Sequence, residues 1–218
     1  MRLGCLCRRL LVSEAGRGHA RGMPNNKSRG ASRSIAGEER GAEKRSRILQ
    51  RLADEVLLTG LDAASLRPLA NAIGTSDRML LYYFPNKETL VTSILGCIVQ
   101  RMLTILDERL PSKRLLDSEE MLRTLWRSLR EPRVHPYMQI WLELAAHAVR
   151  GKEPHRTVGA SIATGLIDWI AVRLSLAKRD QRREAVSVLT RLEGMLLLDA
   201  FGIETRVPRS RERRKPVP

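Results

Sequence analysis

The sequence predicts an all-α fold in which a small three-helix N-terminal domain is joined by a long helix to a larger helical C-terminal domain. Three observations lead to this prediction. Apolar residues recur with helical spacing over most of the chain between residues 43 and 205. Glycine and proline interrupt these stretches at intervals that suit helix boundaries. No run of alternating β-branched residues is long enough to predict a strand.

The first predicted helix ends at Gly60. Its apolar residues repeat with helical period and form one stripe: Ile48, Leu49, Leu52, Ala53, Val56 and Leu57. A glycine after such a stripe is a typical C-cap, because it adopts a positive φ without steric cost. We expect the stripe to cover the core of the segment that follows.

The segment from Ser65 to Lys87, SLRPLANAIGTSDRMLLYYFPNK, has the spacing of a helix-turn-helix. Two short helices that cross steeply need small residues where they approach each other and where the chain reverses. Ala70 and Gly74 stand at those two places. The shared core would consist of Leu69, Ile73 and Leu80.

The second helix of this motif, about residues 77 to 83, has the composition of a recognition helix. Ser76 can cap it and Ser65 can cap the first helix, each by accepting a bond from a free backbone N–H. Its outward side chains are types that bond to phosphates and base edges: Thr75, Asp77, Arg78, Tyr82 and Tyr83. Spacing alone leaves an ordinary helical hairpin with a glycine turn as the alternative.

Over roughly residues 44–95 the chain resembles the TetR family of transcriptional repressors. Members of that family carry a helix ending in glycine, a Thr or Ser, an Ile-Ala pair, Ala-Gly-Val-Ser, Leu-Tyr-x-His-Phe, and a Lys that opens a long fourth helix. The matching positions here are Gly60, Ser65, Leu69-Ala70, Ile73-Gly74-Thr75-Ser76, Leu80-Leu81-Tyr82-Tyr83-Phe84 and Lys87. Three positions depart from the pattern: Leu81 replaces the usual Tyr, Tyr83 a common His, and Arg78 a frequent Gly.

The resemblance implies that this motif binds double-stranded DNA. Tyr82, Tyr83 and Lys87 match phosphate-contacting positions of the family. With the outward residues of the motif, they give the predicted DNA-binding set: Ser65, Thr75, Ser76, Asp77, Arg78, Tyr82, Tyr83 and Lys87. Lys87 would also lie at a helix N-terminus, where charge and free backbone donors both favour an anion.

A long amphipathic run follows Pro85 and extends from Asn86 to Leu110. We interpret this helix as the connector between the two domains. Beyond it, further helices are predicted between Asp117 and Phe201, separated near residues 132–136, 151–154 and 178–180. The last two are predicted over residues 157–176 and 185–201.

The C-terminal helices carry two predicted sites. The resemblance implies a mostly apolar ligand pocket, for which Trp126, Met138, Trp141 and His147 are the candidate lining residues, although each of these side chains taken alone is more typical of the core. The final turns of the last helix are apolar nearly all round, which is typical of a helix buried on both sides. The resemblance implies a four-helix dimer interface, with Ile162, Leu166, Trp169, Leu192, Met195, Leu196 and Phe201 as its residues.

The net charge of +15 is concentrated at the two ends of the chain. Residues 1–47 carry 12 basic and 4 acidic groups, residues 206–218 carry 6 and 1, and the 21 basic and 19 acidic groups between them nearly balance. We predict disordered basic tails over 1–42 and 206–218, which either attract phosphates without sequence preference or only solvate the ends. The domains between them are predicted over 43–88 and 89–205. Met23 is a plausible translation start.

No enzyme motif is present: there is no G-x-S-x-G, no H-E-x-x-H and no phosphate-cradling glycine loop. No metal or cofactor is predicted, because the Cys5-x-Cys7 pair lacks further ligands nearby. With no enzyme or metal site predicted, the resemblance implies a cytoplasmic homodimer, nucleoid-associated and without a membrane segment, that represses transcription until an unknown small-molecule effector releases it from a palindromic operator. Two alternatives remain: a nonspecific nucleic-acid-binding protein that acts through basic tails, and a small helical enzyme with no identifiable site.

Overall fold

The computed structural model describes residues 28–111 and 115–205, with side chains described from residue 40. The described residues form eight helices and no strand, which confirms the predicted all-α fold. The helices are α2 (Ser28–Thr59), α3 (Leu66–Ala72), α4 (Asp77–Tyr83), α5 (Lys87–Arg109), α6 (Ser118–Leu129), α7 (His135–Val149), α8 (His155–Ala171) and α9 (Lys178–Ala200).

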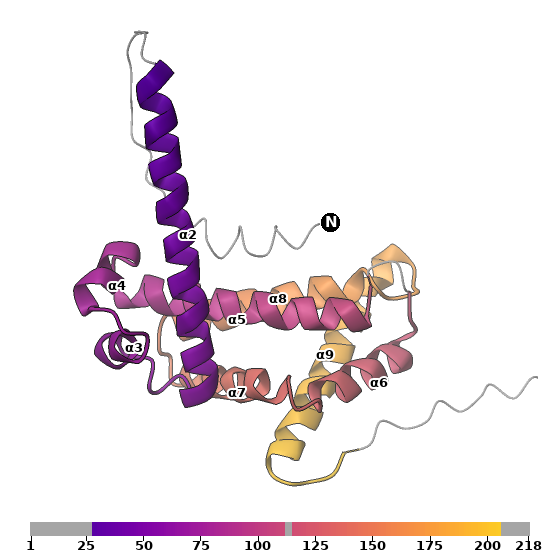
Figure 1. Ribbon diagram of the computed structural model, residues 1–218. Coiled ribbons are helices and arrows are strands. Elements are labelled where there is room, and N and C mark those ends of the chain that lie inside the picture. Colours follow the sequence, from indigo (N-terminus) through magenta and orange to yellow (C-terminus); the bar gives the residue numbers. More distant parts are fainter. Residues whose placement is uncertain (1–27, 112–114, 206–218) are drawn as a thin grey trace, which may run out of the picture.

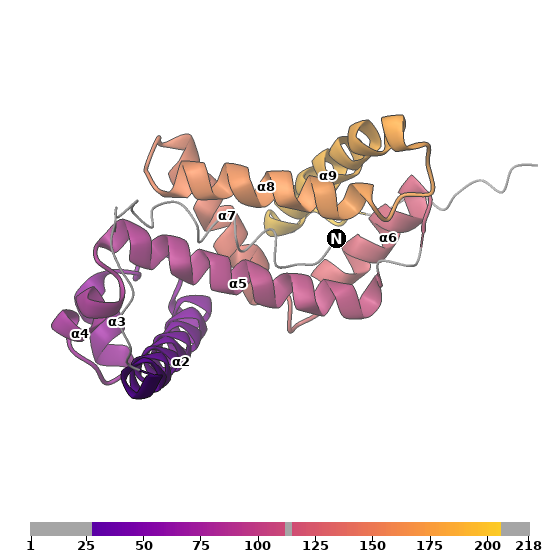
Figure 2. The ribbon, with the colours of Figure 1, turned by 90° about the horizontal axis from the view of Figure 1, so that it is seen from above.

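Helix α5 runs through the molecule and joins its two ends. The short helices α3 and α4 lie together beside its first turns, and α2 crosses it (Figure 1). Helices α6 and α9 lie toward its far end, and α8 runs along it with α7 in contact with both (Figure 2). The predicted arrangement, a small N-terminal helix-turn-helix unit joined by a long helix to a larger helical unit, is therefore present.

Helix α5 is long and apolar enough to cross a membrane by length and composition. However, 67% of its most apolar window is buried within this chain. Its apolar side chains pack against α2, α6, α7 and α8. This is the environment of a central core helix.

Helix α2 begins earlier than predicted. The predicted disordered tail is wrong for residues 28–42, because α2 already starts at Ser28. Residues 38–47 are mostly Glu, Arg, Ala and Lys, which have good helix propensity, and Glu43 pairs with Arg47 one turn later at 3.5 Å. The predictions for residues 1–27, which include Met23 and the two early cysteines, and for 206–218 lie outside the described residues.

The boundary between the last two helices also differs from the prediction. Helix α8 ends at Ala171 rather than residue 176, and α9 starts at Lys178 rather than residue 185. After α8 the chain turns so that Leu174 forms a bridge with Leu116. The polar residues 178–184, which lack an apolar stripe, form the first turns of α9.

The far end of α5 is held by a buried arginine. Arg173, which is 5% exposed, donates to the carbonyl oxygens of Leu110 and Trp169, each at 2.9 Å, and pairs with Asp107 at 2.6 Å. The indole of Trp169 donates to the same carboxylate oxygen of Asp107 at 2.9 Å. Burial lowers the pKa of Arg173, and the Asp107 carboxylate opposes that shift. This cluster fastens the end of α5 to the end of α8.

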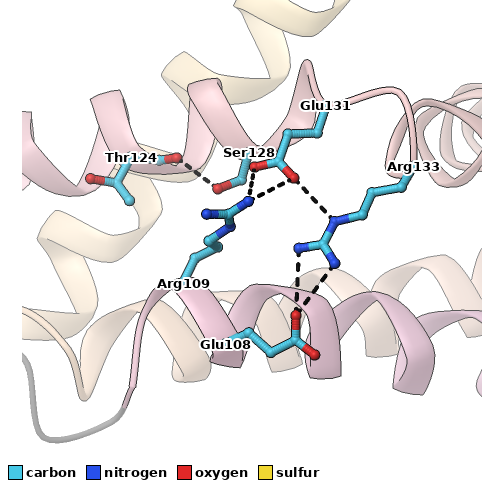
Figure 3. A network of polar contacts seen from close by, with 6 residues as sticks. All are labelled: Glu108, Arg109, Thr124, Ser128, Glu131 and Arg133. Carbon is cyan, nitrogen blue, oxygen red and sulfur yellow. Dashed lines mark hydrogen bonds and ion pairs between the residues drawn. The ribbon is translucent and has the colours of Figure 1, made fainter.

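A second polar network lies on the surface at the same end of α5 (Figure 3). Glu131, in the turn between α6 and α7, pairs with Arg109 at 3.0 Å and with Arg133 at 3.1 Å. Arg133 also reaches Glu108 on α5 at 3.4 Å. Hydrogen bonds from the two arginines, above all from Arg133, lower the pKa of Glu131. Each exposed pair stabilises little alone, but together they tie α5 to this turn.

Candidate nucleic-acid interface and ligand cavity

Helices α3 and α4 form the predicted helix-turn-helix. The predicted shared core is present, because Leu69, Ile73 and Leu80 are all buried. The chain reverses at Gly74, where φ is +66°, a conformation in which a side chain is strained. Phe84, fully buried at the end of α4, closes this core.

The caps of these helices are partly as predicted. Ser76 caps α4, since its hydroxyl accepts from the Met79 N–H at 3.2 Å. Ser65 occupies the N-cap position of α3, but its side chain makes no capping bond, so that part of the prediction is wrong. Asn86 supplies a cap that the sequence analysis did not assign, because its side-chain oxygen accepts from the Thr89 N–H at 2.8 Å.

The eight residues predicted to contact DNA gather at the α3–α4 end of the molecule, and none is buried. Arg78, Lys87 and Tyr82 are exposed, and Tyr82 is 77% exposed. Ser76 is exposed as well, whereas the other four are half-buried: Ser65, Thr75, Asp77 and Tyr83. The rings of Tyr82 and Tyr83 pack edge to face with their centroids 5.0 Å apart.

Arg45 on α2 contacts the end of α4 beneath the predicted DNA-binding surface, and the sequence did not predict this contact. Its Nε donates to the backbone oxygen of Tyr83 at 3.3 Å, and its guanidinium lies 4.7 Å from the centroid of the Phe84 ring. The residue thereby fixes the last turn of α4 against α2. The apolar periodicity of α2 gave no signal for it, because Arg45 lies on the same face one turn before the stripe but is not apolar.

A cavity of about 740 Å³, counted with its opening to solvent, lies in the C-terminal domain. Five helices, α5 to α9, line it with mostly aliphatic side chains. Its wall also contains three aromatic side chains, Tyr137, Trp141 and Trp169, and one acidic side chain, Glu193. An apolar cavity with few polar groups is the usual form of a small-molecule site.

The predicted pocket residues divide between this cavity and other places. Met138 and Trp141 lie in its wall, whereas Trp126 and His147 do not. Trp126 is buried in α6 with the guanidinium of Arg130 5.8 Å from its ring centroid. On α7 the residues that line the cavity end at Leu144, so His147 one turn later faces the N-terminal domain instead.

The predicted dimer residues also need correction. Four of them are buried inside this chain, with side chains no more than 8% exposed: Ile162, Trp169, Leu192 and Leu196. These four line the cavity, and so does the half-buried Leu166. Met195 is half-buried, and Phe201 is 71% exposed. A helix that is apolar all round does not disclose which side faces its own core, so the sequence assigned the inner side to an interface.

Helix α7 also contacts the loop that leads into the helix-turn-helix. A carboxylate oxygen of Glu143 accepts from the Leu61 N–H at 2.5 Å, and His147 Nε2 lies 3.1 Å from Asp62 Oδ1. Gly60 next to this loop has φ +88°, and a Cβ there would lie 3.0 Å from the Glu143 carboxylate oxygens. The rings of His147 and His155 stack 4.6 Å apart, and burial, with a smaller contribution from His147, lowers the pKa of His155.

Helix α5 makes a separate contact with the N-terminal domain. Arg101 donates from Nε to the Gln50 side chain at 2.8 Å and pairs with Asp54 at 2.6 Å. Both partners belong to α2. Thus two helices of the cavity wall, α5 and α7, grip the N-terminal domain through different residues.

Comparisons with known proteins agree with this geometry. The family model of bacterial regulatory proteins of the tetR family matches residues 49–94, which include α3, α4 and the start of α5. No curated protein matches the chain. The fold is similar to the crystal structure of a chain described as a TetR-family transcriptional regulator from Rhodococcus sp.. The TM-score is 0.59 at 21% identity, over 75% of this chain and 90% of that one. The resemblance noted in the sequence is confirmed: residues 49–94 match the tetR family model, and the chain has the fold of a TetR-family regulator.

Proposed function

We propose that the chain is a homodimeric cytoplasmic repressor that binds a palindromic operator on the nucleoid and is released when a small molecule occupies the C-terminal cavity. The observation that carries this proposal is the sharing of helices between the two sites. Helices α5 and α7 each contribute to the cavity wall, and each also holds the N-terminal domain.

The DNA contact would be made by α4 and the first residue of α5. Arg78 and Tyr82 are exposed on α4, where they can reach base edges and phosphates. Lys87 opens α5, so its ammonium and the free N–H groups of that helix end favour the same phosphate. The predicted DNA-binding set of eight residues is the interface that we propose.

The dimer would form through the exposed apolar side chains near α8 and α9. Seven such residues are 41–71% exposed: Val172, Leu176, Val186, Leu197, Leu198, Phe201 and Ile203. A second copy that covers α8 and α9 would remove these side chains from water. These residues replace the buried ones that the sequence predicted for the interface.

Effector release requires that the ligand bind one conformation better than another. A ligand in the cavity touches α5 and α7 directly, and both helices are bonded to the N-terminal domain. A change in their packing would therefore move the two recognition helices of the dimer relative to each other. As predicted, α5 would connect the cavity to the N-terminal domain, and α7 would do so as well through Glu143 and His147.

Footprinting on genomic DNA fragments, together with sedimentation, tests the proposal. A two-fold dimer should protect a palindromic site whose half-sites lie about 34 Å apart or a small expansion of that spacing. A variant without residues 1–27 and 206–218 should bind the same site more weakly. Equal affinity for every duplex, or a monomer at binding concentrations, would contradict the proposal, and loss of all binding without the tails would favour nonspecific attraction.

Substitution of two exposed basic residues should distinguish a contact to the phosphate backbone from a contact to a base. Lys87→Ala should weaken binding to all sequences alike and lower the salt-dependence slope by about one, since one phosphate contact is lost. Arg78→Ala should instead relax the preference at one base pair by about 1–3 kcal/mol if its guanidinium grips a guanine. Binding titrations at several salt concentrations on operator variants measure both effects. An unchanged sequence preference in Arg78→Ala would show that Arg78 contacts the DNA backbone or solvent and not a base.

Gly60→Ala should loosen the hold of α7 on the N-terminal domain. At φ +88° alanine is strained by about 1–2 kcal/mol, and its Cβ would push the Glu143 carboxylate away from the Leu61 N–H. Hydrogen exchange of the Leu61 amide should accelerate. Gly151→Ala is the matched control, because φ there is +70° and the added Cβ meets nothing within 4 Å. Equal exchange at Leu61 in both variants would show that Glu143 does not protect this amide.

A further inference from the structure

The cavity wall contains a single carboxyl group among the residues that the structure describes. Glu193 lies on α9, and its Oε2 accepts from the indole N–H of Trp141 on α7 at 2.7 Å. No other hydrogen bond or ion pair of Glu193 is found within the described parts of the chain, so its Oε1 has no protein partner there. The neighbouring wall is aliphatic and aromatic.

Such surroundings disfavour the carboxylate form relative to the protonated acid, and a nearby cation would offset this. Burial raises the pKa of Glu193, and the hydrogen bond from Trp141 opposes that shift only in part. Among the described residues of the wall, Tyr137 on α7 is the only other titratable group, and burial raises its pKa too, so it stays a neutral phenol near neutral pH. No lysine, arginine or histidine of the described part of the chain lines the cavity. The cation that this site lacks would have to come with the ligand.

The aromatic rings of the wall suit the same ligand. Tyr137, Trp141 and Trp169 all line the cavity, and aromatic faces attract ammonium groups when water is excluded, although the Arg173 guanidinium already covers one face of Trp169. The aliphatic remainder of the wall would accept the apolar part of the molecule. An anionic ligand would instead meet the Glu193 carboxylate with no cation to offset the repulsion.

We propose that the C-terminal cavity binds an apolar molecule with a protonated amine, whose N–H donates to Oε1 of Glu193 while the aromatic side chains and aliphatic wall hold its hydrocarbon part. This inference rests on the proposed function, because it names the chemical class of the effector for the same cavity. Trp141 would act as a positioning residue that fixes the carboxylate toward the ligand.

Calorimetric titration of the full chain with three matched probes tests the proposal. The probes are 4-phenylbutylamine, 4-phenyl-1-butanol and 4-phenylbutyrate, which share one hydrocarbon part and differ in charge. The amine should bind at least about tenfold more tightly than the alcohol, because a charge-assisted hydrogen bond is added, and the carboxylate should bind most weakly. An alcohol that binds as tightly as the amine would overturn the inference, and so would failure of the amine to bind.

Two variants of α9 assign the preference to one residue. Glu193→Gln removes the charge but keeps an oxygen for the Trp141 indole, and it should bring the amine and the alcohol to similar affinities. Glu184→Gln is the same substitution on the same helix outside the cavity wall, and it should keep the preference. A preference that survives in Glu193→Gln would overturn the inference.

The pH dependence of the wild-type chain gives a readout that needs no variant. The amine prefers the ionised carboxylate, so its affinity should rise as the pH rises through the raised pKa of Glu193, whereas the affinity of the alcohol should stay flat or fall. A flat profile for the amine would contradict the pairing with Glu193. Footprinting tests the proposed function separately. If the amine binds but the chain shows no operator preference, the proposed function fails and this inference stands. If only a neutral molecule releases the DNA, the proposed function stands and this inference fails.

Discussion

Arg173→Ala should lower the free energy of unfolding by about 3–5 kcal/mol, because it leaves the partly buried Asp107 carboxylate without its cation. The arginine side chain is only 6% exposed and makes three hydrogen bonds, two of them to carbonyl groups at the ends of α5 and α8. Its guanidinium also lies 3.9 Å from the centroid of the Trp169 ring. Urea unfolding followed by tryptophan fluorescence measures the loss.

Arg191→Ala is the matched control for this prediction. Arg191 also pairs with a carboxylate, Glu119 at 2.5 Å, but the two side chains are 40% and 38% exposed. Water and ions therefore screen the pair, and its loss should change the stability by about 0–1 kcal/mol. Similar losses of stability in the two variants would show that burial does not increase the contribution of the Arg173 ion pair to the free energy of unfolding.

Phe84→Ala should cost about 3–5 kcal/mol of stability and abolish operator binding. The ring is fully buried at the point where α4 ends and the chain enters α5, and it lies beneath the guanidinium of Arg45. Its removal would leave a cavity between α2 and α4, so the recognition helix would lose its fixed orientation. Thermal unfolding and DNA titration on the same sample measure both consequences.

Leu58→Ala on α2 provides the comparison for Phe84→Ala. Leu58 is 82% exposed, so its truncation removes little packing and should change neither stability nor DNA affinity by more than about 0.5 kcal/mol. Retention of full DNA affinity in Phe84→Ala would contradict the role of this core in orienting α4.

The sequence predicts the N-terminal domain well because local chemistry dictates it. The turn at Gly74 requires a positive φ, and the Ser76 cap and the buried Leu69 and Leu80 follow from spacings of a few residues. Helix α5 was predicted to within a residue at each end for the same reason, since Pro85 and Pro111 bracket it. Short-range patterns carry this information without reference to the rest of the chain.

The cavity and the contacts between the two domains could not be predicted in this way. Trp141 meets Glu193 from 52 positions away, and Glu143 meets the Leu61 amide from 82 positions away. Neither pair leaves a periodic signal. Helices α8 and α9 are apolar on more than one side, so periodicity could not separate the wall of an internal cavity from a surface that another copy covers.

The polar contacts at the C-terminal end of α5 fix that end of the helix, so any tilt of α5 would displace its N-terminal end. Its 23 residues span about 34 Å, with Arg173 and the Glu131 network at one end and Lys87 at the other. A tilt of about 5° about the fixed end would displace Lys87 by roughly 3 Å, close to the rise of one base pair. In the proposed two-fold dimer both copies of α5 would tilt, so the distance between the two recognition helices would change by up to about two base-pair steps, enough to put one helix out of register with its half-site.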